Sequence, residues 1–272
     1  MATTSSTPAV ETHTAPPPKT TSPQSQEELL IRKARLWEAG EIGRIGATTY
    51  LHTPLSSFLA PKRLQYPRHW ERGFTQRAQR RMFSPRNLTF VVCTKSNPRL
   101  AVGYAQFVRL GDDEGARRLI ESYSRLERFG LWVLGVVYGV WCWVVSWWVG
   151  GDRSEDKEAA ETFFGWTQLE VKVHWEGRKD RENRWHAQSV VVRKEFQGRK
   201  AGKRLMAEVI GRAENENVVV GLESSANGEM MYRSVGFELL GRFQGGNGFE
   251  GDSGGVMLYT PKARREKGSA KA

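Results

Sequence analysis

The chain has 272 residues, of which 39% are hydrophobic, and its 41 basic and 30 acidic side chains give a formal net charge of +11. This length allows one large domain or two small ones, and the apolar content is enough for a packed core. The two cysteines form no CxxC pair and no disulfide framework, which argues against a disulfide-stapled fold and favours a reducing compartment, cytoplasmic or nuclear. The five histidines show no metal-ligand spacing, so we predict no metal site.

The positive charge is compatible with several partners. A polyanionic small ligand, nucleic acid and an anionic membrane surface would each be attracted to a basic protein. A solvated basic face accounts for the same composition without any partner, so charge alone predicts no specific nucleic-acid contact.

The two ends of the chain differ in composition from the middle. Residues 1–26 are rich in Thr, Ser, Pro and Ala and carry almost no large apolar side chain, so we predict a disordered tail. Residues 262–272 form a basic tail, in which a nuclear-targeting cluster and plain exposed charge both remain open. A single domain is therefore expected over residues 27–261.

The first part of that domain alternates between helical and extended patterns. We expect a strand at 30–35, a helical stretch at 36–59 with Trp37 and Ile42 among its core residues, and a short basic helix near 76–82. Residues 88–93 and 100–107 then predict an antiparallel hairpin turning at Asn97-Pro98. The arginines of the basic helix, Arg77, Arg80 and Arg81, could meet phosphates or could line a solvated face.

A hydrophobic insertion follows at about 111–182. Residues 131–149 contain no charge and five of the ten tryptophans, which meets the length and polarity of a membrane span. A crossing would, however, separate strands that we expect to pair with one another. Three alternatives remain: a capping helix that packs its tryptophans into the core, a helix lying in a membrane interface, and a wall of an apolar acceptor pocket or partner surface. After it we expect a helix over 154–164 and a strand over 168–175.

The most informative stretch runs from residue 185 to residue 237. The apolar runs 189–192 and 218–220 predict buried strands. Between them lies Gln197-Gly198-Arg199-Lys200-Ala201-Gly202, which opens a helical pattern. Small residues at a helix start leave backbone N–H groups free to hold an anion, above all a pyrophosphate. A short helix ending in Tyr232-Arg233-Ser234-Val235-Gly236-Phe237 follows, and 238–243 with 256–259 predict a terminal hairpin around a Gly-rich loop at 244–255.

These two motifs resemble the signatures of the GCN5-related N-acetyltransferase (GNAT) superfamily. The sequences at 185–189 and 221–225 are similar to those of the fungal branch of that family. The resemblance implies an α/β (α+β) fold with a central, mixed, mostly antiparallel twisted sheet of about six to seven strands flanked by helices. One residue departs from the pattern: Lys200 stands where the first glycine of the signature usually lies.

The resemblance also implies an activity, the acetyl-CoA-dependent transfer of an acetyl group to a primary amine. In the family, the loop amides hold the cofactor and the end of the signature strand splays to expose backbone to it. Carried over to this sequence, the expected cofactor-binding residues are Val190, Val191, Val192, Gln197, Gly198, Arg199, Lys200, Ala201, Gly202, Lys203, Tyr232 and either Ser225 or Asn227.

The catalytic roles follow from the same resemblance. Tyr232 is the expected general acid for the leaving thiolate, although a packing role fits the same position. Glu223 and His186 are the candidates for the general base, and a chain of water molecules is the alternative. The acceptor, a small molecule or a peptide amine, is not readable from the sequence, and neither is the oligomeric state. Two other functions stay open: a coenzyme A-binding module weakened by Lys200, and a peripheral membrane protein anchored through 131–149.

Overall fold

The computed structural model describes residues 27–242 and 254–269. The predictions made for residues 1–26 and for most of the Gly-rich loop lie outside the described residues.

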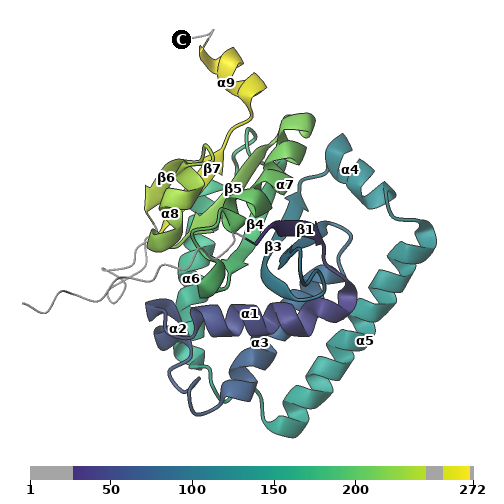
Figure 1. Cartoon of the computed structure of the whole chain (residues 1–272), viewed down its shortest axis with the longest axis vertical. Coiled ribbons are helices and arrows are strands. Elements are labelled where there is room, and N and C mark those ends of the chain that lie inside the picture. The colour runs from purple at the N-terminus through teal and green to yellow at the C-terminus, as the bar shows by residue number, and fades with distance from the viewer. Residues whose placement is uncertain (1–26, 243–253, 270–272) are drawn as a thin grey trace, which may run out of the picture.

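A seven-stranded sheet forms the centre of the molecule (Figure 1). Its spatial order is β1-β2-β3-β4-β5-β7-β6, and only β4 and β5 run parallel. The sheet is therefore mixed and mostly antiparallel, as expected. The strands are β1 (Leu29–Lys33), β2 (Asn87–Thr94), β3 (Ala101–Leu110), β4 (Arg184–Val192), β5 (Val219–Ser224), β6 (Glu238–Arg242) and β7 (Gly255–Tyr259).

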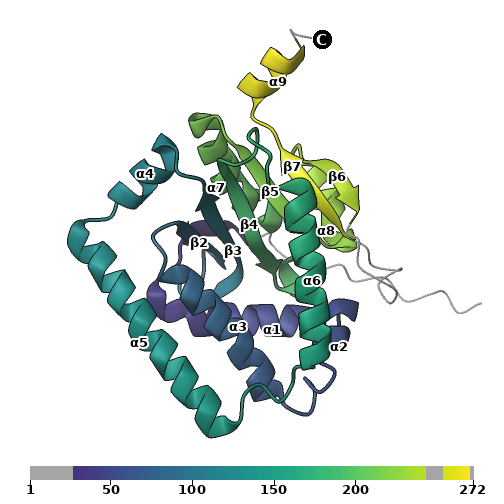
Figure 2. The same cartoon turned by 180° about the vertical axis from the view of Figure 1, so that it is seen from behind.

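Helices cover both faces of this sheet. On one face, α7 buries the apolar stripe that its helical spacing predicts, Leu205, Met206 and Val209, against strand residues such as Phe107 and Trp185. On the other face, α1 and α3 pack on Val91, Tyr104 and Val191, and α6 lies over β5 and β7 (Figure 2). The α-helices are α1 (Ala39–Tyr50), α2 (Pro54–Leu59), α3 (Pro67–Met82), α4 (Glu114–Glu121), α5 (Arg125–Val149), α6 (Lys157–His174), α7 (Ala201–Glu216), α8 (Ala226–Arg233) and α9 (Lys262–Ser269), with short 3₁₀ turns at Leu36–Glu38 and Lys194–Phe196.

The parallel pair opens partway along its length. Strand β4 pairs with β5 only over Arg184–Ala187, opposite Val219–Leu222. Beyond that point β5 continues beside β7, while β4 continues beside β3 alone. The edge of β4 from Gln188 to Val192 that faces β5 is consequently left without a strand partner among the described residues. The sheet thus has a V-shaped opening in its middle.

The predicted strand at 168–175 is wrong, because those residues complete α6. The alternation of Leu169, Val171 and Val173 suggested one buried face, but these three side chains are more than 40% exposed. Glu170 and Trp175 are the residues that turn toward the sheet and are buried. Alternating polarity over only eight residues does not exclude a helix, because a short helix that exposes some apolar side chains produces the same pattern.

Two smaller predictions are also corrected. Trp37 is not a core residue: it is 76% exposed, and the guanidinium of Arg35 lies 5.4 Å from its ring centroid. The basic helix begins earlier than expected, at Pro67, because proline suits the first turn of a helix, where its missing N–H is not needed.

The exposure of the long apolar helix α5 contradicts one of the three alternatives, a capping helix that packs its tryptophans into the core. Its five tryptophans are 52–81% exposed, and Cys142 is its one buried residue. Figures 1 and 2 show it running along the outside of the domain, from α4 at one end to the turn before α6 at the other. The insertion is therefore a strap laid across the domain rather than part of its core.

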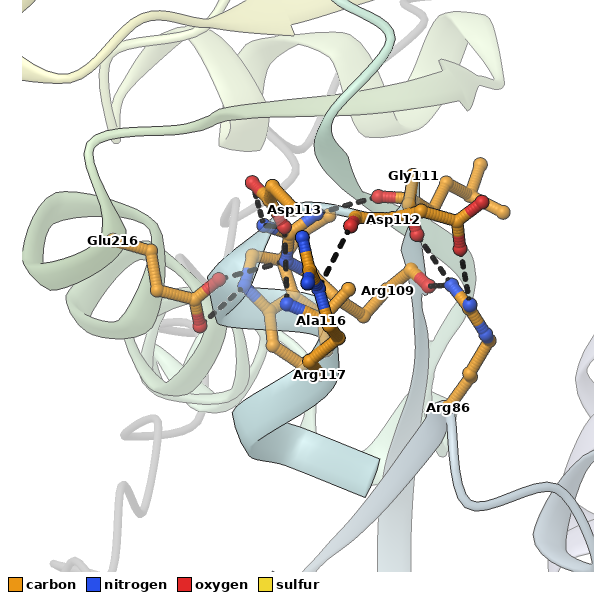
Figure 3. A network of polar contacts seen from close by, with 10 residues as sticks. Arg86, Arg109, Gly111, Asp112, Asp113, Ala116, Arg117 and Glu216 are labelled. Atoms are coloured by element: carbon orange, nitrogen blue, oxygen red, sulfur yellow. Dashed lines mark hydrogen bonds and ion pairs between the residues drawn. The ribbon is translucent and has the colours of Figure 1, made fainter. Parts of the chain in front are cut away.

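A buried ionic network fastens the start of this insertion (Figure 3). The Arg109 side chain at the end of β3 is fully buried, and its guanidinium donates to Asp113 and Glu216, in both cases at 2.7 Å. Asp113 also caps α4 by accepting from the Ala116 amide at 3.0 Å. The network joins β3, α4 and the end of α7, so the strap leaves the sheet at a fixed point.

Candidate active site

The loop between β4 and α7 presents a row of free backbone donors. None of the six amides from Gly198 to Lys203 donates to an acceptor within the described part of the chain. The Gln197 amide, which we expected to join them, instead donates to the Lys194 carbonyl at 3.3 Å. The regular ladder of α7 starts with Arg204 N–H donating to the Lys200 carbonyl at 3.0 Å. An unpaired row at a helix N-terminus is the arrangement that binds phosphate groups.

Two residues give the loop its shape by adopting left-handed backbone. Gly198 has φ of +76° and Lys200 has φ of +61°. Only glycine adopts this region without steric cost, which explains why the family pattern favours a glycine where Lys200 stands. The turn nevertheless forms with lysine in place. Arg199, Lys200 and Arg204 have exposed side chains here, so the donors sit in a positive field.

The signature glutamine links this loop to the open edge of β4. The Gln197 side-chain amide donates to the Val192 carbonyl at 2.9 Å. Arg193 N–H donates to Val102 of β3, and N–H direction alternates along an antiparallel strand. Val191 therefore also points its amide at β3, while Val190 and Val192 point theirs into the V-shaped opening. Two of the three expected backbone contacts are thus available, and the third, Val191, is not.

Tyr232 lies on α8, on the α7 side of the opening. Its ring packs against Phe237 with centroids 5.8 Å apart, and the side chain is 8% exposed. Burial raises the pKa of the phenol, so it stays protonated at neutral pH. Its hydroxyl makes no hydrogen bond with any residue that the structure describes. A protonated phenol with a free hydroxyl can donate a proton, so both its packing and its acid roles are compatible with this position.

The two polar candidates before Tyr232 differ in the hydrogen bonds that they make. The Ser225 hydroxyl caps α8 by accepting from the Gly228 amide at 3.2 Å. Asn227 is exposed in the first turn of that helix and has no hydrogen bond to a described residue. Asn227 is the freer of the two to contact a ligand.

The structure brings both base candidates together. His186 Nε2 lies 2.9 Å from Glu223 Oε2 where β4 and β5 begin to part. Trp175 Nε1 donates to the other carboxylate oxygen of Glu223 at 3.2 Å, and its ring meets the imidazole edge-on. Trp175 reaches this position because Gly221 has no side chain: an added Cβ would lie 2.4 Å from the indole.

Electrostatics fix the roles within this pair. Burial opposes ionisation of Glu223, but the charge and hydrogen bond of His186, the Trp175 indole and Arg184 outweigh it, and the pKa of the carboxyl is lowered. An ionised carboxylate only accepts, so His186 Nε2 must carry a proton. His186 Nδ1 is buried and has no hydrogen-bond partner in the described chain. Nδ1 holds a lone pair only when the imidazole is neutral, and in that state it is the ring nitrogen that can accept a proton.

A polar cluster beside the opening was missed by sequence reasoning. The Ser189 hydroxyl of β4 donates to the Tyr104 hydroxyl at 3.2 Å, and Arg81 of α3 donates to Gln106 at 3.2 Å. Burial raises the pKa of Tyr50 at the end of α1, and the neighbouring phenols Tyr104 and Tyr232 raise it further. Tyrosines on α1, β3 and α8 thus converge from both sides of the sheet. The sequence signal was the pair Tyr104 and Gln106, the polar side chains of the predicted strand at 100–107.

Cavities elsewhere do not belong to this site. A cavity of about 430 Å³ lies between α5 and the start of β2, and one of about 400 Å³ lies between α5 and α3. Their linings include none of the candidate site residues. Within the described residues, no group of three or more His, Cys, Asp or Glu could hold a metal ion.

Comparisons with known proteins relate this chain to acetyltransferases by sequence and by fold. Residues 158–251, about a third of the chain, match the family model of the acetyltransferase (GNAT) domain. A solved structure described as histone acetyltransferase HPA2 and related acetyltransferase, from Corynebacterium glutamicum, shares the fold with a TM-score of 0.51 and 14% identity, covering 86% of this chain and 96% of that one. The PaiA N-acetyltransferase of Thermoplasma acidophilum in complex with coenzyme A gives a TM-score of 0.44 and 10% identity, covering 86% and 99%. A search of curated proteins finds no match.

The family-model match spans the loop with the free amides, the opening of the sheet and Tyr232, and the solved structure from Corynebacterium has the same fold. Residues 158–251 are thus similar to the acetyltransferase (GNAT) domain, and the chain as a whole shares the fold of a solved acetyltransferase structure.

Proposed function

We propose that this protein is an acetyl-CoA-dependent N-acetyltransferase that acts on a primary amine. The observation that carries the proposal is the row of six unpaired amides, Gly198 to Lys203, at the positive end of α7 and next to an open strand edge. A diphosphate needs such donors, and an extended pantetheine arm needs an unpaired strand edge. We further propose that the enzyme is of the fungal type, which rests only on the sequences at 185–189 and 221–225.

The cofactor would supply an acetyl thioester, and the residues around the opening would do the rest. The amides of Gly198 to Lys203 hold the diphosphate, helped by the charges of Arg199, Lys200 and Lys203. The Val190 or Val192 amide polarises the acetyl carbonyl from the open edge of β4. A preorganised donor of this kind is worth about 3–4 kcal/mol of barrier.

Proton transfers fall to residues on opposite sides of the opening. His186 Nδ1 takes the proton of the amine, directly or through water, and Glu223 stabilises the imidazolium that forms. The Tyr232 hydroxyl donates a proton to the departing sulfur. Asn227 is the polar side chain we assign to the cofactor in preference to Ser225.

Lys200 does not favour the alternative of a weakened coenzyme A-binding module. The loop keeps its left-handed turn and its free amides with lysine at this position. The lysine ammonium adds positive charge beside the donors. We therefore assign Lys200 a supporting role in binding the anionic cofactor.

Calorimetric titration with acetyl-CoA tests the proposal. We expect Arg199→Glu to weaken binding by about tenfold, or roughly 1.4 kcal/mol, while Arg178→Glu, the same charge reversal in an exposed turn away from the loop, leaves it unchanged. An amine screen that follows free thiol release then identifies the acceptor. Absence of binding at millimolar acetyl-CoA would refute the proposal, and binding without thiol release from any amine would leave only a binding module.

A further inference from the structure

Helix α5 exposes an apolar surface that no described part of the chain covers. It has 25 residues, and its inner side contacts the domain through Gly135, Tyr138 and Cys142. Its outer side carries side chains that are half exposed or more, including Phe129, Trp132, Val140, Trp143, Trp147 and Trp148. Trp148 is 81% exposed. A continuous surface of this kind on a soluble domain marks a contact with a partner or a membrane.

The helix is long enough to cross a bilayer but is held at both ends. Its 25 residues rise about 37 Å, against a hydrocarbon core of roughly 30 Å. It is the one helix in the described residues that passes a test of length and hydropathy for a membrane span, and only 6% of its most apolar window is buried. At its start, the Arg109 network ties α4 to the sheet (Figure 3).

The other end is fastened to the end of α2 and to the start of α3. Arg72 donates to the Gly151 carbonyl at 3.0 Å, and Asp156 N–H donates to the Leu59 carbonyl at 2.9 Å. Arg153 donates to the Tyr66 hydroxyl at 3.1 Å and lies over its ring. In addition, β3 before the strap and β4 after it pair along most of their length. A crossing would have to break all of these contacts, so α5 can only lie along a surface.

The charges around α5 indicate which kind of surface the helix lies against. No acidic residue occurs between Glu127 and Asp152, and both of these are engaged, Glu127 in the N-terminal capping box and Asp152 with Ser154 and His69. Basic residues border the helix: Arg125 and Arg128 at its start, Arg153 after its end, and Arg68 and Arg72 of α3 along its side. The exposed acids near its two ends are Glu121 on α4 and Glu155. The acid of α3, Glu71, pairs with Arg44.

We propose that α5 lies flat in the headgroup region of an anionic bilayer, with its tryptophans in the interface and its neighbouring arginines on lipid phosphates. Tryptophan is favoured at that depth, and arginine binds phosphate well. A second copy of the chain fits less well. In an antiparallel pair of α5 helices the basic start of one would meet the basic end of the other, and like charges would oppose the pairing.

Vesicle flotation of the full chain tests this assignment. We expect flotation with phosphatidylcholine vesicles that contain phosphatidylglycerol, and much less with phosphatidylcholine alone. Trp143→Glu with Trp147→Glu should weaken partitioning by on the order of tenfold or more. Leu30→Glu with Leu100→Glu is the matched control. These two leucines are each 44% exposed and lie at the end of the β1–β2–β3 part of the sheet that is away from α5. The control variant should float like the wild type.

Depth is measured by quenching tryptophan fluorescence with brominated lipids, since α5 holds five of the ten tryptophans. Shallow bromines should quench more than deep ones. Failure to float with either vesicle, or stronger quenching by deep bromines, would overturn the proposal. So would a wild-type dimer in light scattering that the tryptophan variant converts to a monomer.

Discussion

The left-handed backbone at Lys200 allows a prediction in which stability and cofactor binding move in opposite directions. A non-glycine residue at φ of +61° costs about 1–2 kcal/mol, and glycine adds roughly 0.4–1 kcal/mol of unfolded-state entropy that folding must overcome. Lys200→Gly should therefore raise the free energy of unfolding by about 0.5–1 kcal/mol, a rise in Tm of about 1–4 °C. The same change removes one exposed charge, so affinity for acetyl-CoA should fall about two- to fivefold, or roughly 0.4–1 kcal/mol.

Two matched variants separate these effects. Lys200→Ala removes the charge but keeps a Cβ in left-handed backbone, so it should lose the affinity without gaining the stability. Asn217→Gly relieves the other described non-glycine residue with positive φ, at the far end of α7, and should leave affinity unchanged. Thermal unfolding and calorimetry measure both quantities. If Lys200→Gly is no more stable than Lys200→Ala, the strain assigned to this turn is wrong; if Lys200→Ala binds more tightly than the wild type, the lysine obstructs the diphosphate rather than supporting it.

Three further predictions concern the proposed catalytic groups and the strap. Tyr232→Phe should lower kcat on the order of a hundredfold with an unchanged Kd for acetyl-CoA, because a buried phenol that only packs would be replaced by phenylalanine almost without effect; an unchanged kcat would assign Tyr232 to packing. Glu223→Gln and His186→Gln should each lower kcat at neutral pH by about tenfold or more, the scale of general-base catalysis. The double variant should lose little more activity than either single variant, because the two side chains act as one unit. Additive losses in the double variant would argue against a shared role. Arg109→Met should lower the free energy of unfolding by about 2–4 kcal/mol, because Asp113 and Glu216 keep partly buried charges without their partner. Burial alone would raise the pKa of Asp113, but the Ala116 amide and the Arg109 guanidinium hold it below its usual range. The stability that this group contributes is thus present above its unfolded pKa of about 3.9 and is lost as pH falls through the lower folded value. Denaturant unfolding at a series of acidic pH values should show a smaller acid-side loss in Arg109→Met than in the wild type, and parallel curves would contradict this account.

Local chemistry explains why the signature stretch was predictable. The runs of branched residues in β4 and β5, the glycines of the loop and the stripe of α7 each depend on residues that are close in sequence. The same holds for the hairpin of β2 and β3, whereas the choice of Tyr232 came from the resemblance to the family signature and stays a prediction. Strand alternation failed at 168–175 because eight residues of alternating polarity do not distinguish a strand from a helix with an exposed apolar side.

Tertiary structure decided the arrangement of the site. His186 and Glu223 are 37 residues apart in sequence, and their contact depends on the register of β4 against β5 and on Trp175 crossing Gly221. Which amides of β4 are free depends on its pairing with β3, so Val191 could not be separated from Val190 and Val192 in advance. The tyrosines at the opening come from three elements that only the fold brings together.

The sequence alone showed that α5 is apolar, but only the tertiary structure showed that its side chains are exposed. Nineteen uncharged residues fit a core helix, a membrane span and an interfacial strap equally well, because hydrophobicity measures a preference for leaving water and carries no information about the destination. The ties at Arg109, Arg72 and Arg153 place the helix outside the domain and hold both of its ends there. Sequence therefore determined what each segment prefers, and the long-range contacts decided where each preference could be satisfied.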